Sequence, residues 1–113
     1  MDTLVSAEWL KKHINDPDLV LLDCTVVTIP DANDPRGLRN DSGRQDYELG
    51  HIPSAGFADL KDELCETKGP VEFDLLSPEQ FCAAMGELGV GDDSRVVLYD
   101  ANYMGWAARV WWM

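Results

Sequence analysis

SPEQFCAAMGELGVGDDSRVVLYD, residues 77–100, carries the local signals that decide the fold. Ser77 as N-cap, a proline in the first turn and Gln80 three residues after the serine together predict a capping box. Apolar side chains then recur at helical spacing, and Gly89 is the residue type that favours a left-handed turn after a helix. Residues 95–100 form an apolar run of the length of a buried strand. This stretch therefore predicts a helix that leads through a turn into a strand.

The beginning of the chain shows the same kind of alternation. Ser6 is expected to cap a short helix, which Asp16-Pro17 ends because proline disfavours a helical residue before it. Leu4-Val5 is expected to be a short extended segment ahead of that helix. Residues 19–25, LVLLDCT, form an uninterrupted apolar run that fits a strand buried on both faces, as in a parallel sheet.

The remaining segments carry weaker signals. Residues 28–43 are rich in Pro, Asp, Asn and Gly without any period, which predicts a long loop. Residues 43–50 predict one or two helical turns, and residues 55–59 a short strand. After a polar loop at 101–105, residues 106–113, WAARVWWM, are helical in pattern.

This alternation of strands and helices predicts one α/β domain over residues 1–113. Its expected core is an open parallel sheet with helices on both faces. Ligands of such sheets bind at the carboxyl ends of the strands. The rule directs attention to Cys24-Thr25 and to residues 100–105.

Composition limits the classes of partner. The chain has 21 acidic and 9 basic residues, a formal net charge of -12, which disfavours binding to nucleic acid or to an anionic membrane surface. Residues 1–5 have neither the basic start nor the apolar run of a signal peptide or membrane anchor. The three cysteines form no C-x-x-C pair and no cluster with histidine, so zinc and thioredoxin-type chemistry have no support. We expect reduced thiols and a cytoplasmic location.

Five segments together resemble one family. In order along the chain they are LVSAEWL, VLLDCT, GRQDYELGHIPSA, LLSPEQFCAAMGELGVGDDSRVVLYD and AARVWWM. They resemble the N-terminal domain of tandem-domain rhodaneses, the thiosulfate and 3-mercaptopyruvate sulfurtransferases. GHIPSA, residues 50–55, is similar to the family's GHIPGA signature, with Ser54 in place of a glycine.

The resemblance implies a rhodanese-like three-layer α/β/α fold with a central parallel sheet, truncated before its last strand. It implies that the partner of this chain is a second rhodanese domain of the same protein, which holds the working cysteine. The complete enzyme would pass sulfane sulfur from a small anionic donor, thiosulfate or 3-mercaptopyruvate, to cyanide or a thiol, without metal or organic cofactor. The position that matches the cysteine is Asp100, so no catalytic residue is expected here.

Sulfur transfer needs a polarizable thiolate that attacks a sulfane sulfur and holds it as a persulfide. A carboxylate cannot hold that sulfur, and Asp100 is expected to accept hydrogen bonds from nearby loop amides. The cysteines are poor substitutes: Cys24 lies at a buried strand, Cys82 lies within a helix, and acidic neighbours raise the pKa of Cys65. A single-domain enzyme that uses Cys24 or Cys65 therefore has little support. A phosphatase loop is also disfavoured, because its arginine would fall on Trp106.

Two residues near the GHIPSA signature have two interpretations each. By resemblance, His51 lines the interdomain crevice and assists the second domain, whereas locally it would hydrogen-bond to fix the turn at Pro53. Arg44 either supplies positive potential for an anionic substrate or pairs with Asp46 or Glu48. Together with Asp100, His51 and Arg44 are the residues expected beside the substrate.

Two consequences concern the whole chain. By resemblance a fifth parallel strand would lie between residues 95–100 and the short first segment, and without it an inner strand becomes an open edge. We therefore expect the chain alone to be marginally stable, and to form dimers or exchange elements if it is well folded. The alternative function is a stand-alone, non-catalytic rhodanese-like module for protein interaction. A second repeat with a cysteine in the same gene would favour the enzyme.

Overall fold

A parallel sheet forms the centre of the computed structural model, which describes residues 1–102 and 105–113. Its strands are β1 (Leu19–Asp23), β4 (Gly56–Phe57) and β5 (Arg95–Tyr99), in the spatial order β4-β1-β5. β1 pairs with β5 in register from Leu19 opposite Arg95 to Asp23 opposite Tyr99. The predicted parallel sheet is therefore confirmed, with β1 inside it.

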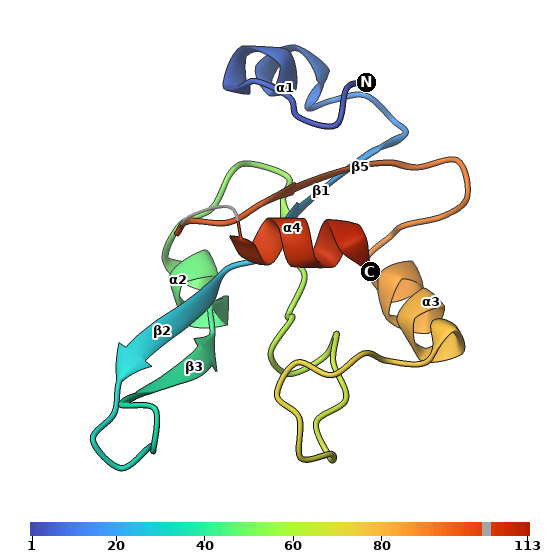
Figure 1. The fold of residues 1–113 in the computed structure, drawn as a ribbon. Helices are drawn as coiled ribbons and strands as arrows, with labels where there is room; N and C mark the ends of the chain where they lie inside the picture. Colours follow the sequence, from blue (N-terminus) through green and yellow to red (C-terminus); the bar gives the residue numbers. More distant parts are fainter. Residues whose placement is uncertain (103–104) are drawn as a thin grey trace.

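Helices cover both faces of this sheet (Figure 1). They are α1 (Ala7–His13), α2 (Arg44–Leu49), α3 (Pro78–Glu87) and α4 (Gly105–Trp112). On one face, side chains of α1 pack with Leu21 and Val97; on the other, side chains of α3 and α4 pack around Leu22. Since alternate residues of a strand point to opposite faces, β1 supplies both cores and the domain has the expected three layers.

The two predicted helix starts are present. Ser77 Oγ accepts a hydrogen bond from the N–H of Gln80 at 3.2 Å, and Gln80 Oε1 accepts one from the N–H of Ser77 at 3.1 Å. Ser6 Oγ accepts a hydrogen bond from the N–H of Trp9 at 3.0 Å. Gly89 has φ of +86°, as its position after α3 requires.

The prediction of a long loop over residues 28–43 was wrong. The chain there forms an antiparallel hairpin of β2 (Val26–Pro30) and β3 (Leu38–Ser42), which projects from the body of the domain (Figure 1). Side chains hold the pair together and tie it to the loop beyond residue 66. Thr28 Oγ1 donates to Asn40 Oδ1 at 2.8 Å, and Asn40 Nδ2 donates to Glu72 Oε1 at 2.7 Å.

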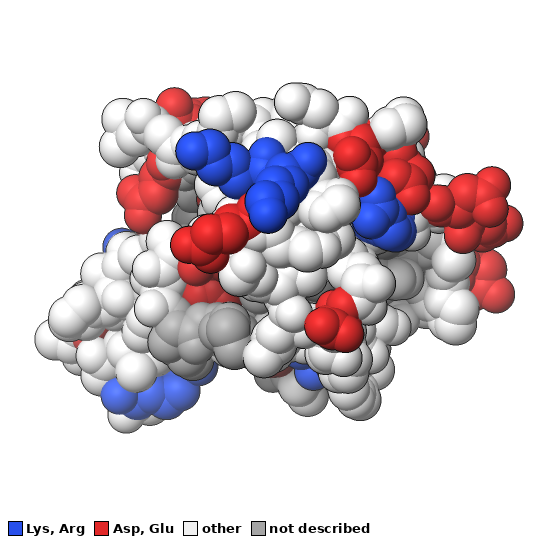
Figure 2. Space-filling model, turned by 90° about the horizontal axis from the view of Figure 1, so that it is seen from above, with Lys and Arg blue, Asp and Glu red and all other residues white. Residues whose placement is uncertain are grey.

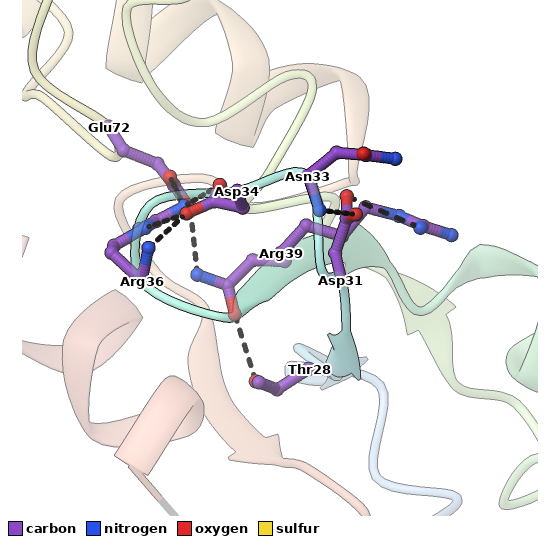
Figure 3. Close-up of polar contacts among 8 residues, drawn as sticks. Thr28, Asp31, Asn33, Asp34, Arg36, Arg39 and Glu72 are labelled. Carbon is purple, nitrogen blue, oxygen red and sulfur yellow. Dashed lines mark hydrogen bonds and ion pairs between the residues drawn. The ribbon is translucent and has the colours of Figure 1, made fainter.

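Arg36 adds a second link between the hairpin and that loop. Its guanidinium lies between Asp34, at 3.1 Å, and Glu72, at 3.0 Å (Figure 3). The pKa of Glu72 is held below its ordinary value, first by the hydrogen bond from Asn40 and also by the charges of Lys61 and Arg36. The hairpin is therefore held by polar contacts between distant segments. Its sequence lacks the alternation of apolar and polar residues by which a strand is usually predicted.

The two ends of the chain differ from the expectations in detail. Leu4-Val5 belongs to no strand, and the first helix ends at His13, three residues ahead of Asp16. The polar loop expected at 101–105 lies partly outside the described residues, and its last residue, Gly105, already belongs to α4. Within residues 1–102 and 105–113, no helix is long and apolar enough to cross a membrane.

Candidate functional site

The carboxyl ends of β1 and β5 lie side by side and carry a buried polar cluster. Asp23, the last residue of β1, accepts hydrogen bonds at Oδ1 from the N–H of Thr25 at 3.0 Å and from Thr25 Oγ1 at 2.6 Å. The N–H of Ala101, beyond β5, donates to Thr25 Oγ1 at 3.0 Å. Thr25 therefore fixes the start of the loop after β5 against the end of β1, at the edge where such sheets bind ligands.

Asp100 opens that loop and accepts hydrogen bonds from one backbone amide of the loop and one of α4. Oδ1 accepts from the N–H of Asn102 at 3.0 Å, and Oδ2 accepts from the N–H of Ala107 at 2.9 Å. The second amide lies in the first turn of α4, where N–H groups have no partner within the helix. The prediction that Asp100 accepts a hydrogen bond from a loop amide is confirmed for Asn102, and its second partner belongs to α4.

Cys24, next to this cluster, is fully buried between β1 and β2. Its N–H donates to the carbonyl oxygen of Tyr99 at 2.7 Å, which holds the residue in the sheet. Burial raises the pKa of the thiol to about 12, and the charges of Asp23 and Asp100 act in the same direction. Cys24 is therefore a protonated core thiol at neutral pH.

The other two cysteines lie away from the strand ends. Cys65 is buried, and its thiol donates to the carbonyl oxygen of Lys61 at 3.0 Å. Its pKa is raised, mainly by burial and further by neighbouring acids such as Asp62, against the opposing charge of Lys61. Cys82 is exposed on α3.

His51 follows α2 and is held by that helix. Its Nδ1 lies 2.7 Å from the carbonyl oxygen of Tyr47, and the two rings stack with centroids 3.8 Å apart. The hydroxyl of Tyr47 in turn donates to the carbonyl oxygen of Ala55 at 2.6 Å. His51 is thus held by a local hydrogen bond, but to Tyr47 in α2 and not at the turn at Pro53, and its exposed ring remains accessible from solvent.

Arg44, in the first turn of α2, is paired as expected but with other acids than predicted. Its Nε lies 3.5 Å from Asp59 Oδ2, and one terminal nitrogen donates to Glu63 Oε1 at 3.4 Å. The guanidinium also lies 5.0 Å from the centre of the Phe57 ring. The prediction that Arg44 pairs with Asp46 or Glu48 was wrong, because its guanidinium points toward the segment after β4, where Asp59 and Glu63 lie.

The three predicted site residues are thus held by separate sets of partners. Asp100 belongs to the loop after β5, whereas Arg44 and His51 belong to α2 and the turn after it. Asp59, the buried acid that receives both Arg44 and Ser42 Oγ, was missed. Only its place as the last residue of the predicted strand at 55–59 pointed to it. Among the described residues, no group of three or more His, Cys, Asp or Glu is placed to hold a metal ion.

Comparison with known proteins gives a consistent result. The family model described as rhodanese-like domain matches residues 6–113. The chain is 38% identical over 109 residues to the 3-mercaptopyruvate sulfurtransferase of Escherichia coli K12, covering 96% of this chain and 36% of that protein. It is 34% identical over 112 residues to the mitochondrial thiosulfate/3-mercaptopyruvate sulfurtransferase 1 of Arabidopsis thaliana, covering 99% of this chain and 27% of that protein.

Among solved structures, the chain is similar to SseA from Escherichia coli, described as a 3-mercaptopyruvate sulfotransferase with the rhodanese fold. The TM-score is 0.79 at 34% identity, and the match covers 100% of this chain and 40% of SseA. The chain therefore spans about a third of the length of the curated relatives that it matches.

Proposed function

Because this chain belongs to the family of rhodanese-like domains, we propose that it is the non-catalytic N-terminal domain of a two-domain sulfurtransferase. Its partner would be a second rhodanese domain that carries the nucleophilic cysteine. The substrate class is a small anion with a transferable sulfur, thiosulfate or 3-mercaptopyruvate, and the acceptor is cyanide or a thiol. The names of the relatives and the share of their length that this chain covers support the proposal.

The reaction needs a nucleophile that the two buried cysteines, Cys24 and Cys65, are poorly suited to supply, and the exposed Cys82 lies within α3, away from the strand ends. A thiolate attacks the outer sulfur of thiosulfate, the sulfur–sulfur bond breaks, and sulfite leaves with the electron pair. Cyanide then attacks the persulfide, and thiocyanate leaves as the thiolate is restored. The attacking group must be an accessible thiolate, and Cys24 and Cys65 are buried with raised pKa values.

The single observation that carries the proposal is the bonding of Asp100. This carboxylate accepts hydrogen bonds from the amides of Asn102 and Ala107, which are donors that could otherwise hold an anionic substrate. A negative charge at this position repels thiosulfate and keeps the donors occupied. The carboxylate of Asp100 therefore occupies two amides that an anionic substrate would need.

We assign His51, Arg44 and Asp100 to the surface that borders the crevice between the two domains. His51 keeps an exposed ring, and the side chain of Arg44 is 43% exposed, so both can face a neighbouring domain.

Figure 2 shows acidic side chains spread over the face seen from above, with basic side chains in only a few places. Because the net charge is -12, an anionic substrate would depend mainly on positive groups of the second domain.

A cytoplasmic location is part of the same proposal. The three cysteines are free in the structure, which is the usual state of thiols in a reducing compartment.

The test is a sulfur-transfer assay on the purified 113-residue chain, with thiosulfate or 3-mercaptopyruvate as donor and cyanide as acceptor. We expect no thiocyanate above the uncatalysed rate from a sample whose fold is verified by circular dichroism. Turnover that is abolished by Cys24→Ser, Cys65→Ser or Cys82→Ser would refute the proposal, because this domain would then carry its own nucleophile.

A further inference from the structure

The hydroxyl of Tyr99 lies between two parts of the candidate site. Tyr99 is the last residue of β5 and pairs in register with Asp23 at the end of β1. Paired residues of neighbouring strands point to the same face of a sheet, so these two side chains are neighbours. Tyr99 Oη accepts a hydrogen bond from the N–H of Ile52 at 3.2 Å and donates one to the carboxylate of Asp23. One hydroxyl therefore links the turn after α2 to the buried end of β1.

A second hydroxyl, that of Thr25, makes the corresponding link on the other side. Thr25 Oγ1 donates to Asp23 Oδ1 at 2.6 Å and accepts from the N–H of Ala101 at 3.0 Å. Asp23 is 5% exposed and Thr25 3% exposed, so these bonds are shielded from water, where a lost partner is costly. Backbone amides of two loops thus reach a single buried carboxylate, each through one hydroxyl.

The two loops tied in this way carry residues that we assign to the crevice surface. Ala101 directly follows Asp100, and Ile52 directly follows His51. The side chains of Asp100 and His51 have separate partners, but the backbone next to each of them is connected to the same acceptor. Hydrogen bonds that share an acceptor influence one another, so a shift of one loop affects the other.

The turn after His51 is also held from α2, by another tyrosine. The hydroxyl of Tyr47 donates to the carbonyl oxygen of Ala55 at 2.6 Å, and the N–H of Ala55 donates to the carbonyl oxygen of Ile52 at 3.0 Å. Ser54, within the turn, has φ of +70°, a conformation that persists only where the surroundings hold it. Tyr47 therefore fixes the same turn by a contact that does not run through the strand ends.

We propose that Asp23 and Tyr99 are positioning residues that hold the His51 turn and the Asp100 loop in one fixed relation. Asp23 is the common acceptor, Tyr99 reaches the turn, and Thr25 reaches the loop. The assignment rests on the proposed function in treating His51 and Asp100 as parts of one crevice surface. Its hydrogen bonds are tested without sulfur transfer. Turnover by this chain would therefore refute the proposed function and leave the coupling of the two loops standing.

The test is NMR-detected amide hydrogen exchange on the 113-residue chain and on variants that each lack one hydroxyl. Tyr99→Phe should speed the exchange of the Ile52 amide at least about fivefold, the effect of losing one hydrogen bond. It should also shift the amide resonance of Ala101, in the other loop. Thr25→Val should act in the opposite order, with exchange faster at Ala101 and a shifted resonance at Ile52. Responses confined to the loop next to each substitution would overturn the proposal.

Tyr47→Phe is the matched control. It removes a hydroxyl that holds the same turn, so it should perturb the amide of Ala55 while the amide of Ala101 stays unchanged. An equal response of Ala101 to Tyr47→Phe and Tyr99→Phe would contradict the route through Asp23, because the effect would then be a general loosening of the turn.

The titration of Tyr99 gives a readout that loosened packing alone does not produce. Burial raises the pKa of the Tyr99 hydroxyl against the bond from Ile52, and the charge of Asp23 and its hydrogen bond raise it further. Asp23→Asn keeps the shape of the side chain and removes the charge, so it should lower this pKa, as read from the ring resonances of Tyr99. The amides of Ile52 and Ala101 should both exchange faster in the same variant. An unchanged titration, or faster exchange in only one loop, would overturn the assignment of Asp23.

Discussion

Asp100 combines two roles at the scale of a single residue. Its Oδ1 accepts from the N–H of Asn102 in the loop after β5, and its Oδ2 accepts from the N–H of Ala107 in the first turn of α4. We expect Asp100→Ala to lower the free energy of unfolding by about 1–2 kcal/mol, the usual effect of removing a helix-capping acceptor. Urea unfolding measures the change, and Asp93→Ala, at an exposed turn position, should change it little. Equal stability of the two variants would show that the Asp100 contacts do not hold the loop.

Ser54 occupies a backbone conformation that suits glycine. Its φ is +70°, in the left-handed region, and it stands where the family's GHIPGA signature has a glycine. Ser54→Gly should therefore raise the free energy of unfolding by about 1 kcal/mol, because glycine adopts this conformation without strain from a Cβ. Ser54→Ala keeps the Cβ and should give no such gain. A stabilisation by both variants, measured by thermal unfolding, would point to a cause other than φ.

Cys24 makes stability depend on pH in the alkaline range. The folded thiol keeps its proton up to a pKa of about 12, whereas an ordinary thiol has a pKa of 9.0. Above pH 9 the unfolded chain loses this proton and the folded chain does not, so the free energy of unfolding falls as the pH rises toward 12. Below pH 9 the contribution is fully present. Urea unfolding at several pH values should show a shallower fall for Cys24→Ala than for the unaltered chain, and parallel curves would contradict the burial of this thiol.

At the scale of elements, Gly43 joins the hairpin to α2 at a point of close backbone approach. A Cβ added there would overlap with the carbonyl oxygen of Thr25. Gly43→Ala should therefore destabilise the fold by about 1–3 kcal/mol, as overpacking does, and loosen the amides of β2 and β3. Gly86→Ala is the matched control: it lies in α3 with open space around it and should stabilise the fold by up to about 1 kcal/mol. If both substitutions have the same sign, the close approach at Gly43 is not as described.

Helices and strands whose formation depends on neighbouring residues in the sequence could be predicted. The capping box at Ser77 and the apolar run of β1 each depend on residues within one short window, so α3 and β1 were predicted correctly. The hairpin was not, because β3, LRNDS, is polar and its pairing depends on contacts such as Thr28 with Asn40 and Asn40 with Glu72. Those contacts join segments 12 and 32 residues apart, which no short window contains.

In the candidate site, too, contacts between residues close in sequence were predicted and contacts between distant residues were not. Asp100 could be assigned because the strand before it and the loop after it are adjacent in sequence, and its acceptors bind amides only two and seven residues away. The partners of Arg44 could not be assigned, because Glu63 lies 19 residues further along and is brought close by the turn after β4. The contacts of Asp100 with amides close in sequence could therefore be predicted. The sequence could not show whether Arg44 pairs with acids nearby in sequence or with distant ones.

At the scale of the whole molecule, the family and the fold agree on one account. The chain matches a rhodanese-like domain over residues 6–113 and spans about a third of its curated relatives. Its sheet ends at β5 in the described residues, where Leu4 and Trp111 stay exposed. On the proposed function, sulfur transfer depends on a thiolate from outside this chain.

The most direct measurement of the central claim is the intact mass of the chain after incubation with thiosulfate or 3-mercaptopyruvate. A catalytic cysteine would hold one transferred sulfur atom as a persulfide, and cyanide would remove it. The account predicts an unchanged mass with both donors, before and after cyanide. A single added sulfur on Cys24, Cys65 or Cys82 that cyanide removes would contradict it, because that cysteine would then be the nucleophile this domain is proposed to lack.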